Sequence, residues 1–122
     1  MARVLIADND LARRAAIEAM VRQCGYDAAT VGSGDAAVAT LAERSFDAAL
    51  VNLVLPGLDG MGVLRRLVET GIAVPVIVQT GPDRADAVAA ALAAGARDFL
   101  IAPASFERLA VALRNALDAA AL

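Results

Sequence analysis

The sequence predicts an α/β domain in which a doubly wound parallel sheet is covered by helices on both faces. Short apolar runs alternate five times with longer segments of helical periodicity along the 122 residues. The central runs are apolar throughout, which is typical of parallel strands buried on both sides. The length suits one domain, and no linker or repeat divides the sequence, so we expect residues 1–122 to form a single domain.

The first two strand–helix units are predicted within the first 44 residues. An apolar run at residues 4–7 predicts the first strand, and apolar residues at helical spacing predict a helix over residues 10–24, ended by a glycine. Residues 26–31 are less apolar, as expected of an edge strand. The tripeptide SGD at residues 33–35 opens a second helix, which reaches about residue 44.

The third and fourth units follow with a similar pattern. Residues 46–51 predict a buried strand, and the helix after it ends near Gly71. Residues 74–78 predict the fourth strand, with a proline at its entry where proline is tolerated. The alanine-rich residues 83–94 predict the fourth helix. The apolar positions of the third helix are Leu64, Leu67 and Val68.

The fifth unit combines a short strand at residues 99–101 with the last helix. Ser105 precedes that helix and is a typical N-terminal cap, because its hydroxyl can accept a hydrogen bond from a free backbone N–H group. One face of the helix is apolar and is expected to pack against the sheet. The residues of this face are Phe106, Leu109, Leu113 and Leu117.

Composition excludes several functional classes. The chain contains no histidine and no lysine, so all eleven basic residues are arginine, and the commonest general base and metal ligand is absent. The net charge of −3 argues against nucleic-acid binding, which needs clustered positive charge. The single cysteine, Cys24, excludes an internal disulfide. No apolar stretch has the length of a membrane span, and Asp8 and Asp10 interrupt the early apolar run, so we expect a cytoplasmic protein.

Polar residues gather where the predicted strands end. The tetrapeptide ADND at residues 7–10 follows the first strand, Asn52 follows the third, and Gln79 and Thr80 follow the fourth. The segment APAS at residues 102–105 follows the fifth. Because the carboxyl ends of parallel strands meet at one edge of the sheet, we expect these residues to line one shallow pocket there.

These motifs resemble the receiver domain of bacterial two-component response regulators over essentially the whole chain. The resemblance rests on the acidic cluster after the first strand, on FDAALVNLVLPGLDGMGVLRRL around the third, on VPVIVQTG at the fourth and on AGARDFLIAP at the fifth. It implies a flavodoxin-like sheet of strand order 2-1-3-4-5 with five helices. It also implies a signalling module of a phosphorelay rather than an enzyme.

The resemblance implies a phosphoacceptor pocket, of which three positions depart from the family's pattern. Asp8 matches the first acidic metal ligand, Asn9 stands at the second, and Asn52 replaces the aspartate that accepts the phosphoryl group. Ala102 replaces the lysine that binds the phosphoryl oxygens. Thr80 matches the Ser or Thr of the family that binds the phosphoryl group, and Phe99 matches the aromatic residue that reports the switch.

We therefore interpret the chain as a degenerate, non-phosphorylatable pseudo-receiver. Mg²⁺ is usually held by carboxylates, and Asp8 alone remains, so magnesium binding is expected to be weak or absent and no cofactor is expected. An amide at residue 52 is no nucleophile, and alanine at residue 102 supplies no cation for the developing charge. The expected partners are a histidine kinase, another receiver or an attached output domain, without nucleic acid or membrane. A homodimer could form through residues 83–94, 99–101 and the last helix.

Three alternatives remain open at this point. Asn52 could be an engineered replacement of the acceptor in a working receiver. The pocket, or a surface bearing Arg84, Arg97 and Arg108, could bind a small anionic ligand such as a nucleotide second messenger, because the arginine fork suits phosphate. The run VLIADND also fits the Asp-x-Asp motif of haloacid dehalogenase-type phosphatases, with Asp8 as nucleophile and Asp10 as acid or base.

Overall fold

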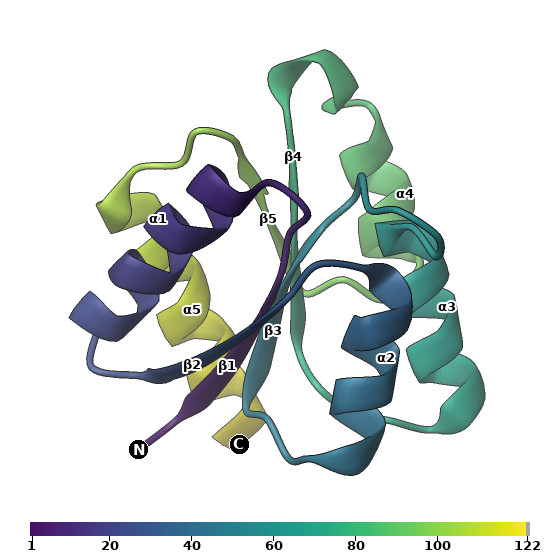
Figure 1. Cartoon of the computed structure of the whole chain (residues 1–122), viewed down its shortest axis with the longest axis horizontal. Helices are drawn as coiled ribbons and strands as arrows, with labels where there is room; N and C mark the ends of the chain where they lie inside the picture. Colours follow the sequence, from purple (N-terminus) through teal and green to yellow (C-terminus); the bar gives the residue numbers. More distant parts are fainter. Residues whose placement is uncertain (122) are drawn as a thin grey trace.

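The computed structural model describes residues 1–121, and side chains through residue 118. Five parallel strands form one sheet of order β2-β1-β3-β4-β5, which confirms the predicted topology (Figure 1). The strands are β1 (Arg3–Ala7), β2 (Asp27–Val31), β3 (Ala48–Asn52), β4 (Val76–Thr80) and β5 (Asp98–Ile101). The helices are α1 (Leu11–Gln23), α2 (Gly34–Glu43), α3 (Gly60–Thr70), α4 (Ala87–Ala93) and α5 (Phe106–Ala121), with a 3₁₀ turn η1 (Pro82–Arg84) before α4.

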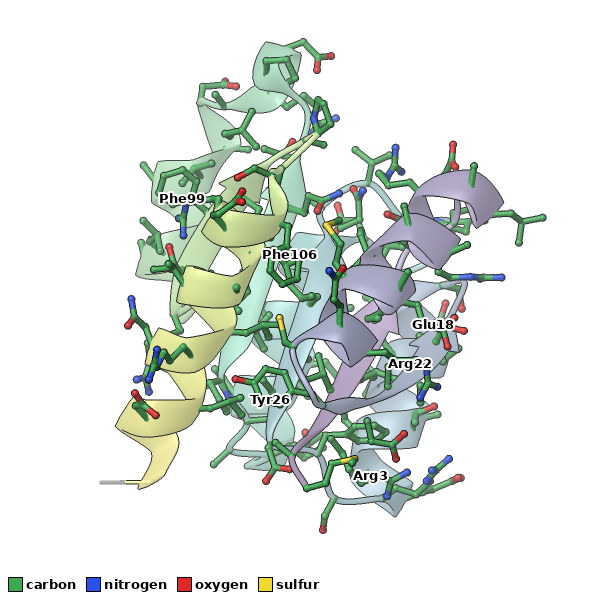
Figure 2. The ribbon with its side chains drawn as sticks, turned by 90° about the vertical axis from the view of Figure 1, so that its left-hand side faces the viewer. Arg3, Glu18, Arg22, Tyr26, Phe99 and Phe106 are labelled. Carbon is green, nitrogen blue, oxygen red and sulfur yellow. The ribbon has the colours of Figure 1, made fainter. Side chains whose placement is uncertain are left out.

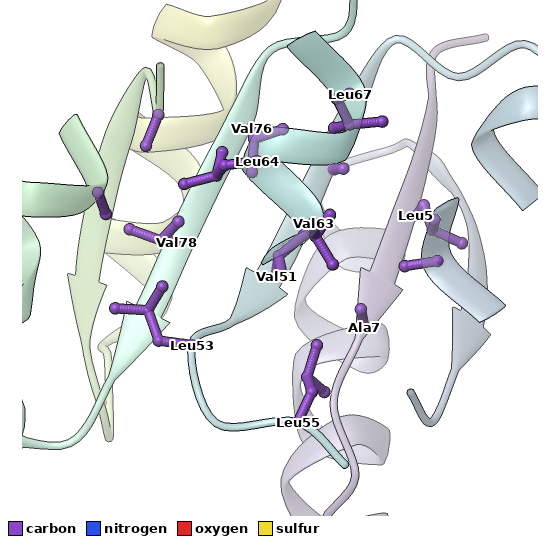
Figure 3. Packing of buried hydrophobic residues seen from close by; sticks show 14 of the residues in the cluster. Leu5, Ala7, Val51, Leu53, Leu55, Val63, Leu64, Leu67, Val76 and Val78 are labelled. Atoms are coloured by element: carbon purple, nitrogen blue, oxygen red, sulfur yellow. The ribbon is translucent and has the colours of Figure 1, made fainter. Parts of the chain in front are cut away.

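The helices cover the sheet in two layers, with α1 and α5 on one face and α2, α3 and α4 on the other (Figure 1). Each face has its own apolar core because successive side chains of a strand point to opposite sides. Figure 3 shows the core under α2–α4, where Val51 and Val78 of the sheet meet Val63 and Leu67 of α3. The core under α1 and α5 is built from Ile6, Ile77, Ile17, Val21, Leu109 and Leu113, among others.

Polar side chains cap the first turns of α1, α2, α3 and α5 and so help to determine which residues of these helices face the sheet edge. The side chain of Asp10 accepts a hydrogen bond from Arg13 N at 2.8 Å, that of Ser33 from Ala36 N, and that of Asp59 from Gly62 N. Ser105 accepts from the N–H of Arg108 at 3.1 Å, which confirms its predicted capping role.

Two predicted elements were placed wrongly. The fourth strand, expected at residues 74–78, is β4 (Val76–Thr80), because its pairing with β3 runs from Ala49↔Val76 to Asn52↔Gln79. The fourth helix, expected over residues 83–94, is the turn η1 followed by the shorter α4. Only Val88 and Ala91 of α4 are buried, so alanine propensity is supported by little packing there.

Of the three apolar positions that indicated α3, Leu64 and Leu67 are buried, whereas Val68 is 71% exposed. Val68 follows Leu67 directly and is turned about 100° further around the helix, away from the sheet. Among the described residues, no helix is both long and apolar enough to cross a membrane.

Candidate functional site

The strand ends bring four polar side chains together at the carboxyl edge of the sheet. The strands are in parallel register, with Ala7 beside Val51, Asn52 beside Gln79, and Thr80 beside Ile101. The polar residues that follow or end these strands are buried, although they lie at the edge of the sheet. They are Asp8 (1% exposed), Asn52 (7%), Gln79 (4%) and Thr80 (1%).

The carboxylate of Asp8 is held by the guanidinium of Arg13. Arg13 Nε donates to Oδ2 at 2.6 Å and Nη2 donates to Oδ1 at 2.8 Å, a bidentate pair. The backbone N–H of Asp10 also donates to Oδ1, at 2.9 Å. The hydrogen bond to Asp8 raises the pKa of the Arg13 guanidinium, and burial opposes this in part. Asp8 is therefore neutralised by the chain's own cation.

Sequence reasoning missed Arg13, although a signal for it exists. Asp10 caps α1, so Arg13 is the third residue of that helix and lies in its first turn, next to the end of β1. The signal is an acidic residue after a strand, followed two residues later by a helix cap and three residues after that by an arginine. This spacing is enough to suggest an ion pair between the acidic residue and the arginine. Arg14 adds a bond from Nη1 to the carbonyl oxygen of Asp8, at 3.3 Å.

Asn52 is fully engaged at the end of β3. Its Oδ1 accepts a hydrogen bond from the N–H of Val54 at 2.9 Å, and its Nδ2 donates to Asp8 Oδ2 at 3.4 Å. Asn52 therefore caps the backbone that follows β3. Asn9 is exposed, and within the described residues no hydrogen bond joins it to Asn52.

The donor set does not fit a carboxylate-held magnesium ion. Mg²⁺ prefers octahedral oxygen coordination and usually one or more free carboxylates. Both oxygens of Asp8 are bonded to Arg13, and the carboxylate of Asp10 caps α1. In the part of the chain that the structure describes, no group of three or more His, Cys, Asp or Glu side chains could hold a metal ion.

The β4–β5 side of the site is less well paired. The hydroxyl of Thr80 is buried without a hydrogen-bond partner among the described residues. Ala102 lies just beyond β5, and its N–H donates to the carbonyl oxygen of Thr80 at 2.8 Å. The peptide bond between Ala102 and Pro103 is cis. The methyl group of Ala102 supplies no charge and no hydrogen-bonding group at the strand ends.

Phe99 is half-buried and packs against the core under α2–α4. Arg108 of α5 covers it, with the guanidinium 5.6 Å from the ring centroid. Nη2 of Arg108 also donates to the carbonyl oxygen of Phe99 at 2.7 Å and to Asp98 Oδ1 at 3.0 Å. Figure 2 shows Phe99 on the side of α5 that faces away from α1. These contacts hold the ring in place and occupy Arg108.

The three arginines considered for an anion-binding surface do not converge. Arg84 lies in η1, just after the end of β4, whereas the N–H of Arg97 bonds to the carbonyl oxygen of Val76 at the start of β4. The two are therefore at opposite ends of the sheet, and Arg97 lies away from the pocket. Arg108 is paired with Asp98.

Known proteins show both the sequence pattern and the fold. The chain is 32% identical to the transcriptional regulatory protein ZraR of Salmonella typhimurium over 114 residues, which are 93% of this chain and 26% of that protein. The chain thus spans about a quarter of that relative's length. A putative response regulator from Chloroflexus aurantiacus superposes with a TM-score of 0.88 at 26% identity, covering 96% of this chain and 98% of that one.

A further solved structure is the receiver domain of a sensor histidine kinase from Pseudomonas aeruginosa PAO1, which has a magnesium ion coordinated in its active-site cleft. It superposes with a TM-score of 0.87 at 29% identity, over 96% of this chain and 98% of that one. The sequence model of the response regulator receiver domain matches residues 4–114. The chain therefore belongs to the response regulator receiver domain family.

Proposed function

We propose that this receiver domain takes up no phosphoryl group at residue 52 and acts in two-component signalling through protein contacts. The observation that carries the proposal is the network at the end of β1 and β3. Asn52 supplies an amide in place of a carboxylate nucleophile, and Asp8 is bound by Arg13 through bonds of 2.6 and 2.8 Å. Magnesium binding is correspondingly weak or absent in this proposal.

In this proposal, the chain lacks three parts of the machinery for phosphoryl transfer. Transfer to the chain needs a nucleophile, a divalent cation on the phosphoryl oxygens and further positive charge in the transition state. Asn52 is no nucleophile, and Ala102 carries no charge. Arg13 is positive, but its charge is balanced by Asp8 through two hydrogen bonds.

The test is phosphate incorporation from acetyl phosphate with Mg²⁺, followed by intact-mass measurement. The wild-type chain is expected to gain no phosphate, and Asn52→Asp alone to gain little. The triple variant Asn9→Asp, Asn52→Asp, Ala102→Lys is expected to gain phosphate. Adding Arg13→Gln should speed incorporation further because Asp8 is then free to bind the metal.

The same experiment distinguishes this proposal from the alternative in which Asn52 is an engineered replacement of the acceptor in a working receiver. If Asn52→Asp is modified as fast as the triple variant, the pocket is competent apart from residue 52, and the proposal is wrong. A phosphate found at residue 52 of the wild-type chain would refute it directly.

The partners follow from the family. A histidine kinase, another receiver or an output domain is the proposed partner, and ZraR is named as a transcriptional regulatory protein. For self-association, the surface of α4, β5 and α5 offers the exposed apolar residues Leu92 and Val111. Sedimentation over a range of concentrations tests the homodimer; a monomer at every concentration would exclude it.

Phosphatase activity of the Asp-x-Asp type is not proposed. A nucleophilic Asp8 would have to be free to attack, but its oxygens accept bonds from Arg13, Asp10 N and Asn52. The carboxylate of Asp10 caps α1. An assay with a generic phosphate ester and Mg²⁺ is expected to show no turnover.

A further inference from the structure

A groove of about 590 Å³ lies between α1, the end of β4 and the connection from β5 to α5. We call it the α1–β5 groove. Its walls are mostly apolar and include Ala16, Ile17 and Met20 of α1 and Ala102 and Pro103 after β5. Figure 2 shows the face of the molecule on which α1 and α5 lie side by side.

The end of the groove at the sheet edge is polar because Gln79 lines it. Gln79 follows Ile77 by two positions, so it points to the α1–α5 face of the sheet. Gln79 is 4% exposed, and its side chain has no hydrogen-bond partner among the described residues. Its carboxamide is not sealed off, since the hydroxyl of Thr80 is the only fully buried side-chain group left unpaired in the described part of the chain. The carboxamide of Gln79 is therefore open to the groove, where it can both donate to and accept from a partner outside the chain.

Arg13 contributes the second polar group of the groove. Its Nε and Nη2 are bonded to Asp8, which leaves the N–H groups of Nη1 free for another acceptor. The Arg13–Asp8 pair carries no net charge, and the carboxylate of Asp10 is close to Arg13 as well. A ligand group that accepts a hydrogen bond is therefore favoured beside Arg13, whereas a ligand group with a full negative charge is not.

The small side chain at residue 102 leaves the groove open. Ala102 forms part of the wall, so a bulky apolar side chain such as leucine at this position would occupy part of the space. The groove thus combines an apolar body with one end that offers the donor and acceptor of Gln79 and the spare donors of Arg13. A carboxamide complements Gln79 by donating to its oxygen and accepting from its nitrogen.

We propose that the α1–β5 groove is a binding site for a small, uncharged ligand that has an apolar body and a carboxamide-like end. The apolar body lies against Ala16, Met20 and Pro103, and the polar end pairs with Gln79. This goes beyond the proposed signalling function and does not depend on it, because phosphate incorporation and ligand binding are measured separately.

The test is an NMR titration of the ¹⁵N-labelled chain with benzamide, together with benzoate and benzyl alcohol as probes of similar size. Benzamide is expected to shift the resonances of Gln79, Ala102 and Ala16 saturably, with a Kd in the millimolar range expected of so small a probe. Benzoate is expected to bind at least about tenfold more weakly because Asp8 and Asp10 balance Arg13. Benzyl alcohol, which lacks the amide, should also bind more weakly.

Variants locate the site and its polar end. Ala102→Leu fills the groove and is expected to weaken benzamide binding at least about tenfold. Gln79→Leu should remove the preference for benzamide over benzyl alcohol. The matched control is Ala89→Leu, which adds the same side chain on the exposed face of α4. The dispersion of each variant's spectrum reports whether it is folded.

Three results would overturn the proposal. Benzamide-induced chemical-shift changes that do not saturate would exclude a small-ligand site, and a protein partner would then be the occupant of the groove. Equal binding to wild type and folded Ala102→Leu would place the probe elsewhere. Benzoate binding as tightly as benzamide would show that the site accepts anions.

Discussion

The two halves of the strand-end site differ in how their polar groups are paired. In the β1–β3 half, the carboxylate of Asp8 accepts four hydrogen bonds and both polar atoms of the Asn52 side chain are used. In the β4–β5 half, the hydroxyl of Thr80 is buried without a partner, and the carboxamide of Gln79 has no partner in the described part of the chain but is open to the groove. Both halves are buried to a similar degree, so burial alone does not distinguish them.

The difference shows which half has all its polar groups paired without a ligand. The β1–β3 half contains its own cation, so its buried carboxylate is compensated within the chain. In the β4–β5 half, the buried hydroxyl of Thr80 lacks a partner at a cost in stability, and the carboxamide of Gln79 is left free to bind a partner in the groove. The three substitutions below test this contrast, from the largest expected effect to the smallest.

Arg13→Met should lower the free energy of unfolding the most, by about 2–3 kcal/mol. The substitution leaves the Asp8 side chain, which is 2% exposed, without its cation; the effect is moderated because the Arg13 side chain is 40% exposed. Urea unfolding measures the change. Arg65→Met, an exposed position on α3, is the matched control and should be nearly neutral.

A second substitution checks that the loss comes from the pair. Asp8→Asn in the Arg13→Met background should recover part of the stability, because no buried charge is then left unpaired. A double variant that loses the sum of the two single losses would contradict the pairing.

Asn52→Asp should lower the free energy of unfolding by about 1–2 kcal/mol at neutral pH, since it places a second carboxylate beside Asp8. The substitution also removes the Nδ2 donor that Asp8 now accepts from. We expect Mg²⁺ at millimolar concentration to restore little of this stability, because Arg13 holds Asp8. Thermal unfolding with and without Mg²⁺ measures both quantities, and full recovery by the metal would show that Asp8 is available to it.

Thr80→Val should change the free energy of unfolding least, within about 0.5 kcal/mol and toward higher stability. The reason is that the hydroxyl is buried without a partner, so its removal breaks no hydrogen bond. Ser33→Ala is the comparison, because it removes a paired hydroxyl that caps α2 and should cost about 1 kcal/mol. A larger loss from Thr80→Val than from Ser33→Ala would mean that the β4–β5 half is paired after all.

Most of the fold could be predicted because its signals are local. Apolar runs identify the strands, and the Ser105 cap and the apolar face with Leu109 and Leu113 identify α5. The boundaries of β4 could not be read in this way, since its ends are decided by pairing with β3. The length of α4 likewise depends on how much of an alanine-rich segment the sheet can bury.

The sequence alone shows the alternation of strands and helices, the edge at which the polar residues gather, and the residue types Asn9, Asn52 and Ala102 at that edge. These depend on periodicity and residue type, which are local properties. The three-dimensional structure was needed to show that Arg13 binds Asp8 and that Gln79 turns its carboxamide toward a groove. Both depend on the position and rotation of α1 relative to the sheet. These are set by the Asp10 cap and by packing between residues distant in sequence.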